Sequence, residues 1–300
     1  MLKKLAILAT CLTCLNATAS IKIDEITKAN DLAGFNVTNT TNNQKFDVYY
    51  APELKSAAFQ ALSVLDKMYT ELAVNAGAVP KDVKWAELAF VTDENYIPPR
   101  SEGVVRWKIV HPVQENLSDI AIERIHLLIS HEQTHSIQSR IVCDSPRWFE
   151  EGQAMWNELK VAEKWNSDLA HAERLSYEQK FREIEGDLNL DNWGGIKVKP
   201  EAIQRQLTPE QKQKMEEDPS YFPSGPFSFG PGDFISDESN TEARYFVSLT
   251  IFELLEKRLG SDKLKSLFND VYQMSSCESE ELKEFIKSKY GVDISSFFHH

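Results

Sequence analysis

The sequence predicts an α+β fold that is mainly helical. Short runs with strand character are confined to the stretch between residues 46 and 110, whereas amphipathic helical periodicity dominates the chain from residue 120 onwards. The 300 residues include 42% hydrophobic residues, which is enough for a sizeable core in one two-lobed unit or in two small domains.

The first 19 residues have the features of a secretory signal peptide. Lys3 and Lys4 precede an apolar run from Leu5 to Leu15, and small residues at Ala17 and Ala19 form a cleavage site. This run is too short to span a bilayer, and no later run is long and apolar enough to do so. The sequence therefore predicts an exported protein, periplasmic or secreted, without a transmembrane segment.

The mature chain is strongly acidic. Removal of Lys3 and Lys4 leaves 31 basic residues against 46 acidic ones, a net charge of −15. Such a charge argues against nucleic acid or an anionic membrane surface as a partner.

The first half of the mature chain alternates between strand and helix patterns. Residues 20–45 are polar and rich in asparagine and threonine, which favours a loose N-terminal segment. Phe46–Tyr50 is predicted as a strand and Lys55–Gly77 as an amphipathic helix. Trp85–Val91 and Gly103–Val110 are predicted as two further strands, separated by a proline-rich turn.

The chain then reaches a candidate metal site, His131-Glu132-Gln133-Thr134-His135. Two histidines four residues apart on a helix lie about 40° from one another, so both imidazoles can reach one metal ion. Glu132 points about 100° from His131, where it can hold a water molecule as a general base without being a ligand.

An apolar stripe supports the inward orientation of these histidines. Ala121, Ile125 and Leu128 are spaced so that His131 and His135 continue the same helix face. The alternative is a metal-free structural role. Each buried histidine would then need hydrogen-bond partners from the protein.

A second helix supplies the third candidate ligand. Ser145-Pro146 is a helix start signal, with serine as the N-cap and proline at the first helical position. The residues on its apolar face are Trp148, Phe149, Gly152, Met155, Trp156 and Leu159. Glu151 borders this face and is the better ligand, whereas Glu150 lies nearly opposite it and is predicted to be a solvated charge. The alternative is that both glutamates are surface charges. Gly152 suits a close approach of two helix backbones.

Two cysteines remain in the mature chain, Cys143 and Cys277. In an oxidising compartment two cysteines most simply form one disulfide, and a pair of buried free thiols is the alternative.

The last part of the chain returns to helix after an irregular stretch. The sequence becomes charged and irregular beyond Leu175, and residues 186–240 form an insertion that either covers a cleft or is disordered. Helices are predicted at Thr241–Leu259, Asp262–Met274 and Glu278–Tyr290.

The motif His131-Glu132-x-x-His135, followed by Trp148-x-x-Glu151-Gly152-x-Ala154, resembles the gluzincin zinc metallopeptidases, in particular the bacterial peptidase MA-like proteins. The resemblance implies a zincin-type catalytic fold with a small upper sheet, a central HExxH helix and a helical lower lobe. On this basis residues 46–141 form the upper lobe with the zinc helix, and residues 142–300 form the lower lobe. One Zn²⁺ per chain would be bound by His131, His135 and Glu151.

The family resemblance also implies a function and further roles. The substrate would be a peptide or protein, cleaved by a zinc-activated water with Glu132 as the general base. Tyr245, at the head of a helix similar to the family's tyrosine-led helix, is the candidate donor to the oxyanion. The Gly103–Val110 strand would be the sheet edge that pairs with substrate, with an ordinary interior strand as the alternative.

The sequence departs from the gluzincins at two places. The Gly103–Val110 strand lacks the G-x-M-E-N segment of zinc aminopeptidases, which argues against a typical aminopeptidase. Met155 stands where thermolysin-like enzymes have an aspartate that orients a zinc-bound histidine, so that partner must come from elsewhere.

Two alternative functions fit the same residues. The first is a non-catalytic zinc-containing binding protein on a gluzincin-like scaffold, although a purely structural zinc site needs no base such as Glu132. The second is an enzyme that hydrolyses a non-peptide amide.

Overall fold

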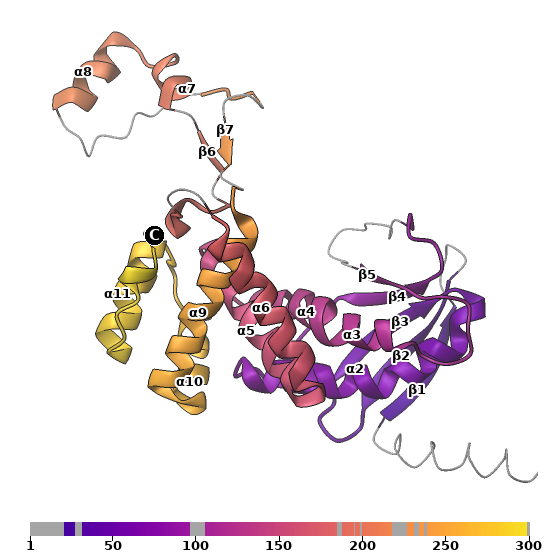
Figure 1. Cartoon of the computed structure of the whole chain (residues 1–300). Helices are drawn as coiled ribbons and strands as arrows, with labels where there is room; N and C mark the ends of the chain where they lie inside the picture. Colours follow the sequence, from indigo (N-terminus) through magenta and orange to yellow (C-terminus); the bar gives the residue numbers. More distant parts are fainter. Residues whose placement is uncertain are drawn as a thin grey trace, which may run out of the picture.

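The chain folds into a sheet-containing lobe and a helical lobe that lie side by side (Figure 1). This computed structural model describes residues 21–27, 32–96, 106–184, 188–194, 196–198, 200–217, 227–230, 234–236 and 239–298. The predicted signal peptide, residues 1–19, lies outside the described residues. The α+β, mainly helical class predicted from the sequence is confirmed.

The sheet of the first lobe has five strands in the order β1-β2-β3-β4-β5. Strands β1 to β3 are antiparallel, whereas β3, β4 and β5 run parallel to one another. The strands are β1 (Ile21–Thr27), β2 (Ala33–Asn39), β3 (Lys45–Tyr50), β4 (Glu87–Val91) and β5 (Arg106–Val110). The predicted strands at 46–50, 85–91 and 103–110 are therefore present, the last from Arg106 in the described residues, and β5 is the terminal strand of the sheet.

The prediction of a loose segment at residues 20–45 is wrong, because β1 and β2 extend the sheet through it. Phe35 and Val37 are buried on the inner face of β2. The asparagines serve the turn that follows: the Asn39 side chain accepts hydrogen bonds from the backbone amides of Thr41 and Asn42. Asn43 takes the left-handed conformation, with φ of 59°. A polar composition here encodes a hairpin turn between two strands.

Helix α2 (Lys55–Asn75) packs against the sheet and confirms the predicted amphipathic helix. Its buried face includes Leu62, Leu65, Tyr69 and Leu72. The Tyr69 ring stacks on Trp85, two residues before β4, with 4.6 Å between the ring centroids.

The helix that carries the histidines has three parts: α3 (Asp119–Arg124), a π-helical turn η3 (Ile125–Ile129) and α4 (Ser130–Gln138). The wider π turn shifts the helix faces, so the predicted stripe is wrong at one position. Ile129 is fully buried, whereas Leu128 is 44% exposed. Single π turns in α-helices are frequent at functional sites.

The helical lobe is built around α5 (Arg147–Trp165). The other helices of this lobe are α6 (Ser167–Arg182), α9 (Thr241–Leu259), α10 (Ser261–Val271) and α11 (Ser279–Tyr290). The three predicted C-terminal helices are therefore confirmed within a few residues. The prediction that the chain becomes irregular beyond Leu175 is wrong, because α6 continues to Arg182. The N-cap of α5 is Pro146, one residue later than predicted.

Gly152 lets α9 approach α5 closely. A Cβ atom at this position would lie 2.7 Å from Phe252 Cε2 and 2.9 Å from the carbonyl oxygen of Ser248. The close approach predicted for this glycine is therefore present, and its partner is α9.

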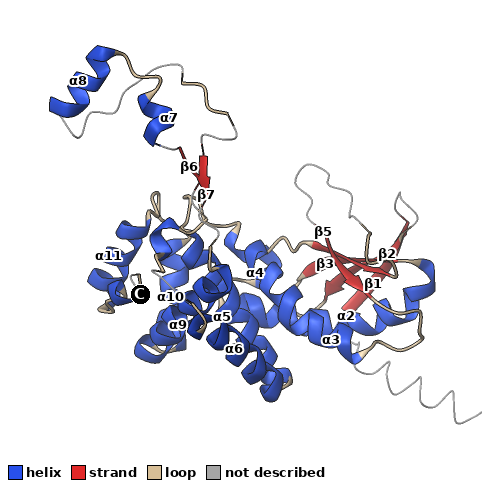
Figure 2. Ribbon diagram, turned by 45° about the horizontal axis from the view of Figure 1, so that its top comes forward, coloured by secondary structure: helices blue, strands red, loops and turns tan. Residues whose placement is uncertain are grey.

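The described part of the insertion at 186–240 has two regions. Residues 188–194, which include a 3₁₀ turn at Leu190–Asn192, return to the helical lobe, where Leu188, Leu190 and Trp193 are buried. The antiparallel pair β6 (Ile196–Val198) and β7 (Phe234–Ser236) leads away to α7 (Pro200–Gln204) and α8 (Pro209–Glu217). Both views show α7 and α8 standing away from the two lobes (Figures 1 and 2).

Cys143 and Cys277 form the predicted disulfide, with 5.7 Å between their Cα atoms. The bond joins the loop between α4 and α5 to the loop between α10 and α11. Within the described residues, no helix combines the length and apolar character needed to cross a membrane.

We expect loss of this disulfide to lower the free energy of unfolding by about 2–5 kcal/mol, because the bond closes a long loop in the unfolded chain. The two cysteines are 134 residues apart in the sequence. Chemical denaturation of the Cys143→Ala/Cys277→Ala variant, beside wild type with and without reductant, measures the change. Equal midpoints for all samples would contradict the expectation.

Candidate metal centre

The three side chains proposed as ligands converge between α4 and α5. His131 and His135 project from α4 and Glu151 from the second turn of α5, and one ligand atom from each lies within 4.8 Å of the other two. The Oε2 atom of Glu151 lies 3.1 Å from His131 Nε2 and 3.6 Å from His135 Nε2. Glu151 is half-buried and His131 is buried.

These distances fit a tetrahedral zinc site. Zinc binds histidine nitrogen and carboxylate oxygen at about 2.0–2.2 Å, which places two ligand atoms of a tetrahedron about 3.3–3.6 Å apart. The two separations measured to Glu151, 3.1 and 3.6 Å, lie close to this range. Two histidines and one glutamate are also a common ligand set of catalytic zinc, which leaves the fourth position for water or substrate.

Both histidines are oriented by a second side chain. His131 Nδ1 lies 3.1 Å from Glu158 Oε2, and His135 Nδ1 lies 2.6 Å from Gln138 Oε1. With Nδ1–H donating to these oxygens, the Nε2 atoms, which both lie beside Glu151, are the ring nitrogens available to bind a metal.

Met155 stands where thermolysin-like enzymes have the aspartate that orients a histidine ligand. The side chain that takes this role beside His131 is therefore Glu158, which the sequence analysis did not identify. Met155 is buried in the core. Glu158 follows Glu151 by seven residues, two turns along the same face of α5, and this spacing is the signal that could have found it.

The carboxylates around His131 determine its charge in the metal-free protein. Burial opposes the protonated form, but hydrogen bonds with Glu151 and Glu158 outweigh it and raise the pKa of His131 to about 10. Burial alone would raise the pKa of Glu151, but the hydrogen bond from His131 and the charges of His135 and Arg147 hold it below the ordinary glutamate value. The metal-free site is thus a buried ion pair.

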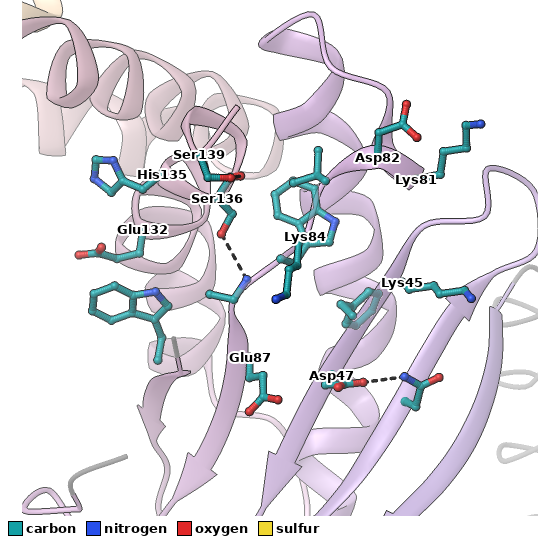
Figure 3. Close-up of a pocket in the computed structure, with 16 residues that line it drawn as sticks. Lys45, Asp47, Lys81, Asp82, Lys84, Glu87, Glu132, His135, Ser136 and Ser139 are labelled. Carbon is teal, nitrogen blue, oxygen red and sulfur yellow. Dashed lines mark hydrogen bonds between the residues drawn. The ribbon is translucent and has the colours of Figure 1, made fainter. Parts of the chain in front are cut away.

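Glu132 lies at the junction of two cavities. The first, the sheet-side cleft, has a volume of about 660 Å³ between α4 and the strand ends, and Lys45, Lys84, Trp107 and His135 are among its lining residues. Figure 3 shows Glu132 and His135 projecting side by side at one end of this cleft, Lys45 and Asp82 at the other end, and Lys84 and Glu87 between them.

The second cavity, the helix-side cleft, has a volume of about 570 Å³ and contains Glu132 as well as His131. Its wall includes the aliphatic side chains of Ile120 and Leu127 and the polar side chains of Glu173 and Tyr177. An extended molecule bound across Glu132 could therefore occupy both clefts.

The environment of Glu132 suits a base. Burial raises the pKa of this carboxyl, and the nearby carboxylates of Glu151 and Glu158 add to the increase, against the opposing positive charge of the histidines. A carboxylate with a raised pKa accepts a proton more readily.

Tyr245 is brought to the same site. The second turn of α9 places its ring 5.9 Å from the His131 ring, edge to face, and Tyr245 lines the helix-side cleft. Burial and the negative charge of Glu151 raise the pKa of Tyr245 to about 12, so its hydroxyl stays protonated at neutral pH and can donate a hydrogen bond.

Glu150 is not part of the metal cluster. Its carboxylate accepts a hydrogen bond from the Ser145 hydroxyl at the start of α5, and it is half-buried rather than fully solvated as predicted. The choice of Glu151 over Glu150 agrees with this geometry.

The chain was compared with protein-family models and with curated proteins. No family model and no curated protein matches it. Its function is therefore inferred from the site itself.

We expect Glu158→Gln to weaken zinc binding about 10- to 100-fold, because the His131 ring loses the carboxylate that orients it. Chelator competition measures the affinity. Glu163→Gln is the matched control, since Glu163 is an exposed glutamate on the same helix. Equal zinc affinity of Glu158→Gln and wild type would contradict the role of Glu158.

We expect zinc binding to release about one proton between pH 7 and 9, because the raised pKa of His131 keeps its ring protonated in the metal-free protein. The affinity should rise about tenfold per pH unit in this range. Calorimetry in buffers of different ionisation enthalpy counts the protons, and binding without proton release would contradict the expectation.

The raised pKa of His131 also makes the stability of the metal-free protein depend on pH. A raised histidine pKa stabilises the fold fully below the ordinary value of 6.5, and this stabilisation is lost as the pH rises through about 10. Zinc-free protein should therefore lose stability from neutral to alkaline pH.

Proposed function

We propose that this protein is an exported zinc-dependent metallopeptidase that hydrolyses peptide bonds. The observation that carries the proposal is the convergence of His131, His135 and Glu151 beside Glu132, where the two clefts meet. One Zn²⁺ per chain would be held by the two histidines and Glu151. The fold would then be of the zincin type, with the sheet above the histidine helix and the helical lobe below it.

The bound metal would polarise the scissile carbonyl and make the attacking water more acidic. Glu132 would accept a proton from that water and pass it to the amine that leaves. Tyr245, whose ring packs against His131, would donate a hydrogen bond to the carbonyl oxygen as it gains negative charge. These roles need one base and one donor close to the ligands, and both residues line the helix-side cleft.

An extended peptide also suits the shape of the site. Strand β5 is the terminal strand of the sheet, and its Trp107 lines the sheet-side cleft together with Glu132. A peptide pairing with β5 would gain main-chain hydrogen bonds that depend little on sequence, and the two clefts would select side chains.

Two features support export. The N-terminal residues have the pattern of a signal peptide, and the disulfide between Cys143 and Cys277 is typical of oxidising compartments.

A Glu132→Gln variant tests the reaction. We expect it to keep one zinc per chain and to lose at least about 100-fold in the rate of peptide cleavage, because it keeps the ligands and removes the base. A peptide library analysed by mass spectrometry identifies cleavage by zinc-loaded wild type, and chelation followed by zinc addition should abolish and restore it.

Two outcomes would overturn the proposal. One is equal turnover by wild type and Glu132→Gln. The other is a folded, zinc-supplemented wild-type protein that binds no zinc.

A further inference from the structure

Arg147, the first residue of α5, contacts both a candidate ligand and the candidate donor. Its Nε atom lies 3.4 Å from Glu151 Oε1, one turn further along the helix. Its side chain also acts on Tyr245, which comes from α9: hydrogen bonding and positive charge from Arg147 oppose the increase in the pKa of Tyr245 that burial causes. One guanidinium therefore links the two helices beside the metal centre.

The arginine is enclosed by residues from the start of the insertion. The Trp193 ring lies under the guanidinium, with 5.1 Å between Arg147 Cζ and the ring centroid. Gly194 has φ of 68°, and a Cβ atom there would overlap Arg147 Cδ. Trp193 also contacts the edge of the Tyr245 ring, at 5.2 Å between centroids. Residues 193 and 194 thus restrict the conformations of Arg147.

The chemistry of arginine decides the direction of a hydrogen bond between Arg147 and Tyr245. A guanidinium has five donors and no acceptor, so Tyr245 must accept through its oxygen. The Tyr245 hydrogen is then left for another acceptor, and the ring lines the helix-side cleft. Arg147 likewise faces Oε1 of Glu151, whereas Oε2 is the oxygen nearest both histidines.

We propose that Arg147 is a positioning residue that holds Tyr245 as a hydrogen-bond donor towards the cleft and restricts Glu151 to binding the metal through Oε2. This inference rests on the proposed function for Tyr245 and on the metal site for Glu151. The two parts are therefore tested by separate measurements.

The first measurement uses metal alone. Arg147→Met should weaken Zn²⁺ binding about tenfold in chelator competition, because Glu151 loses the group that orients it. The visible absorption of the Co²⁺-substituted variant should differ from that of wild type, because both oxygens of Glu151 can then reach the ion. An unchanged affinity together with an unchanged Co²⁺ spectrum would overturn the role at Glu151, whether or not the protein cleaves peptides.

The second measurement is a double-mutant cycle on peptide cleavage at saturating zinc. Tyr245→Phe should lower kcat up to about 100-fold with little change in KM, and Arg147→Met should lower it by a similar or smaller factor. The kcat of the double variant should be no more than about threefold below that of the less active single variant, because Arg147 acts through Tyr245. Fully multiplicative effects would overturn the role at Tyr245.

Matched variants distinguish a positioning role of Arg147 from a general role in packing. Arg174 is as exposed as Arg147, at 32% against 31%, and it also pairs with a glutamate and lies over an aromatic ring. Arg174→Met should therefore leave the zinc affinity, the Co²⁺ spectrum and kcat unchanged. Arg147→Lys should restore kcat only in part, since a lysine cannot offer the fixed fork of donors that reaches both partners.

Discussion

The packing of α4 against α5 depends on His131, whose ring lies between the carboxylates of Glu151 and Glu158. Glu158 is 3% exposed, and a buried carboxylate is costly unless a positive charge or hydrogen-bond donors compensate it. In the metal-free protein the protonated His131 supplies that charge. A bound cation would supply it instead, so folding of this region and metal binding are coupled.

Helix α5 is the element to which the other parts of the centre are attached. It carries the third candidate ligand and the carboxylate that contacts His131, and Gly152 on the same helix admits α9 at close range. That approach brings Tyr245 to within contact of the His131 ring. A larger residue at 152 would push α9 away and move Tyr245 with it, although Gly152 itself touches no ligand.

A disulfide and side-chain packing connect the loops around the candidate metal centre to distant parts of the chain. The disulfide ties the α4–α5 loop to the loop before α11, and Trp193 and Gly194 pack on Arg147 at the first turn of α5. The start of α5 is therefore held from both sides. Two clefts adjoin Glu132, so the candidate ligands lie beside space that a bound molecule can reach.

The sequence by itself determined the features that follow from helical periodicity. The spacing of His131 and His135, the preference for Glu151 over Glu150 and the ranges of the C-terminal helices depend on residues close together in the chain. Only the tertiary structure decided the strands in residues 20–45, the π turn before His131, and the partnership of His131 with Glu158. The link from Arg147 to Tyr245 belongs to the same group. The strand pairing and the side-chain partnerships depend on contacts between separate elements, and a residue pattern within one element limits the candidate partners without deciding which of them makes the contact.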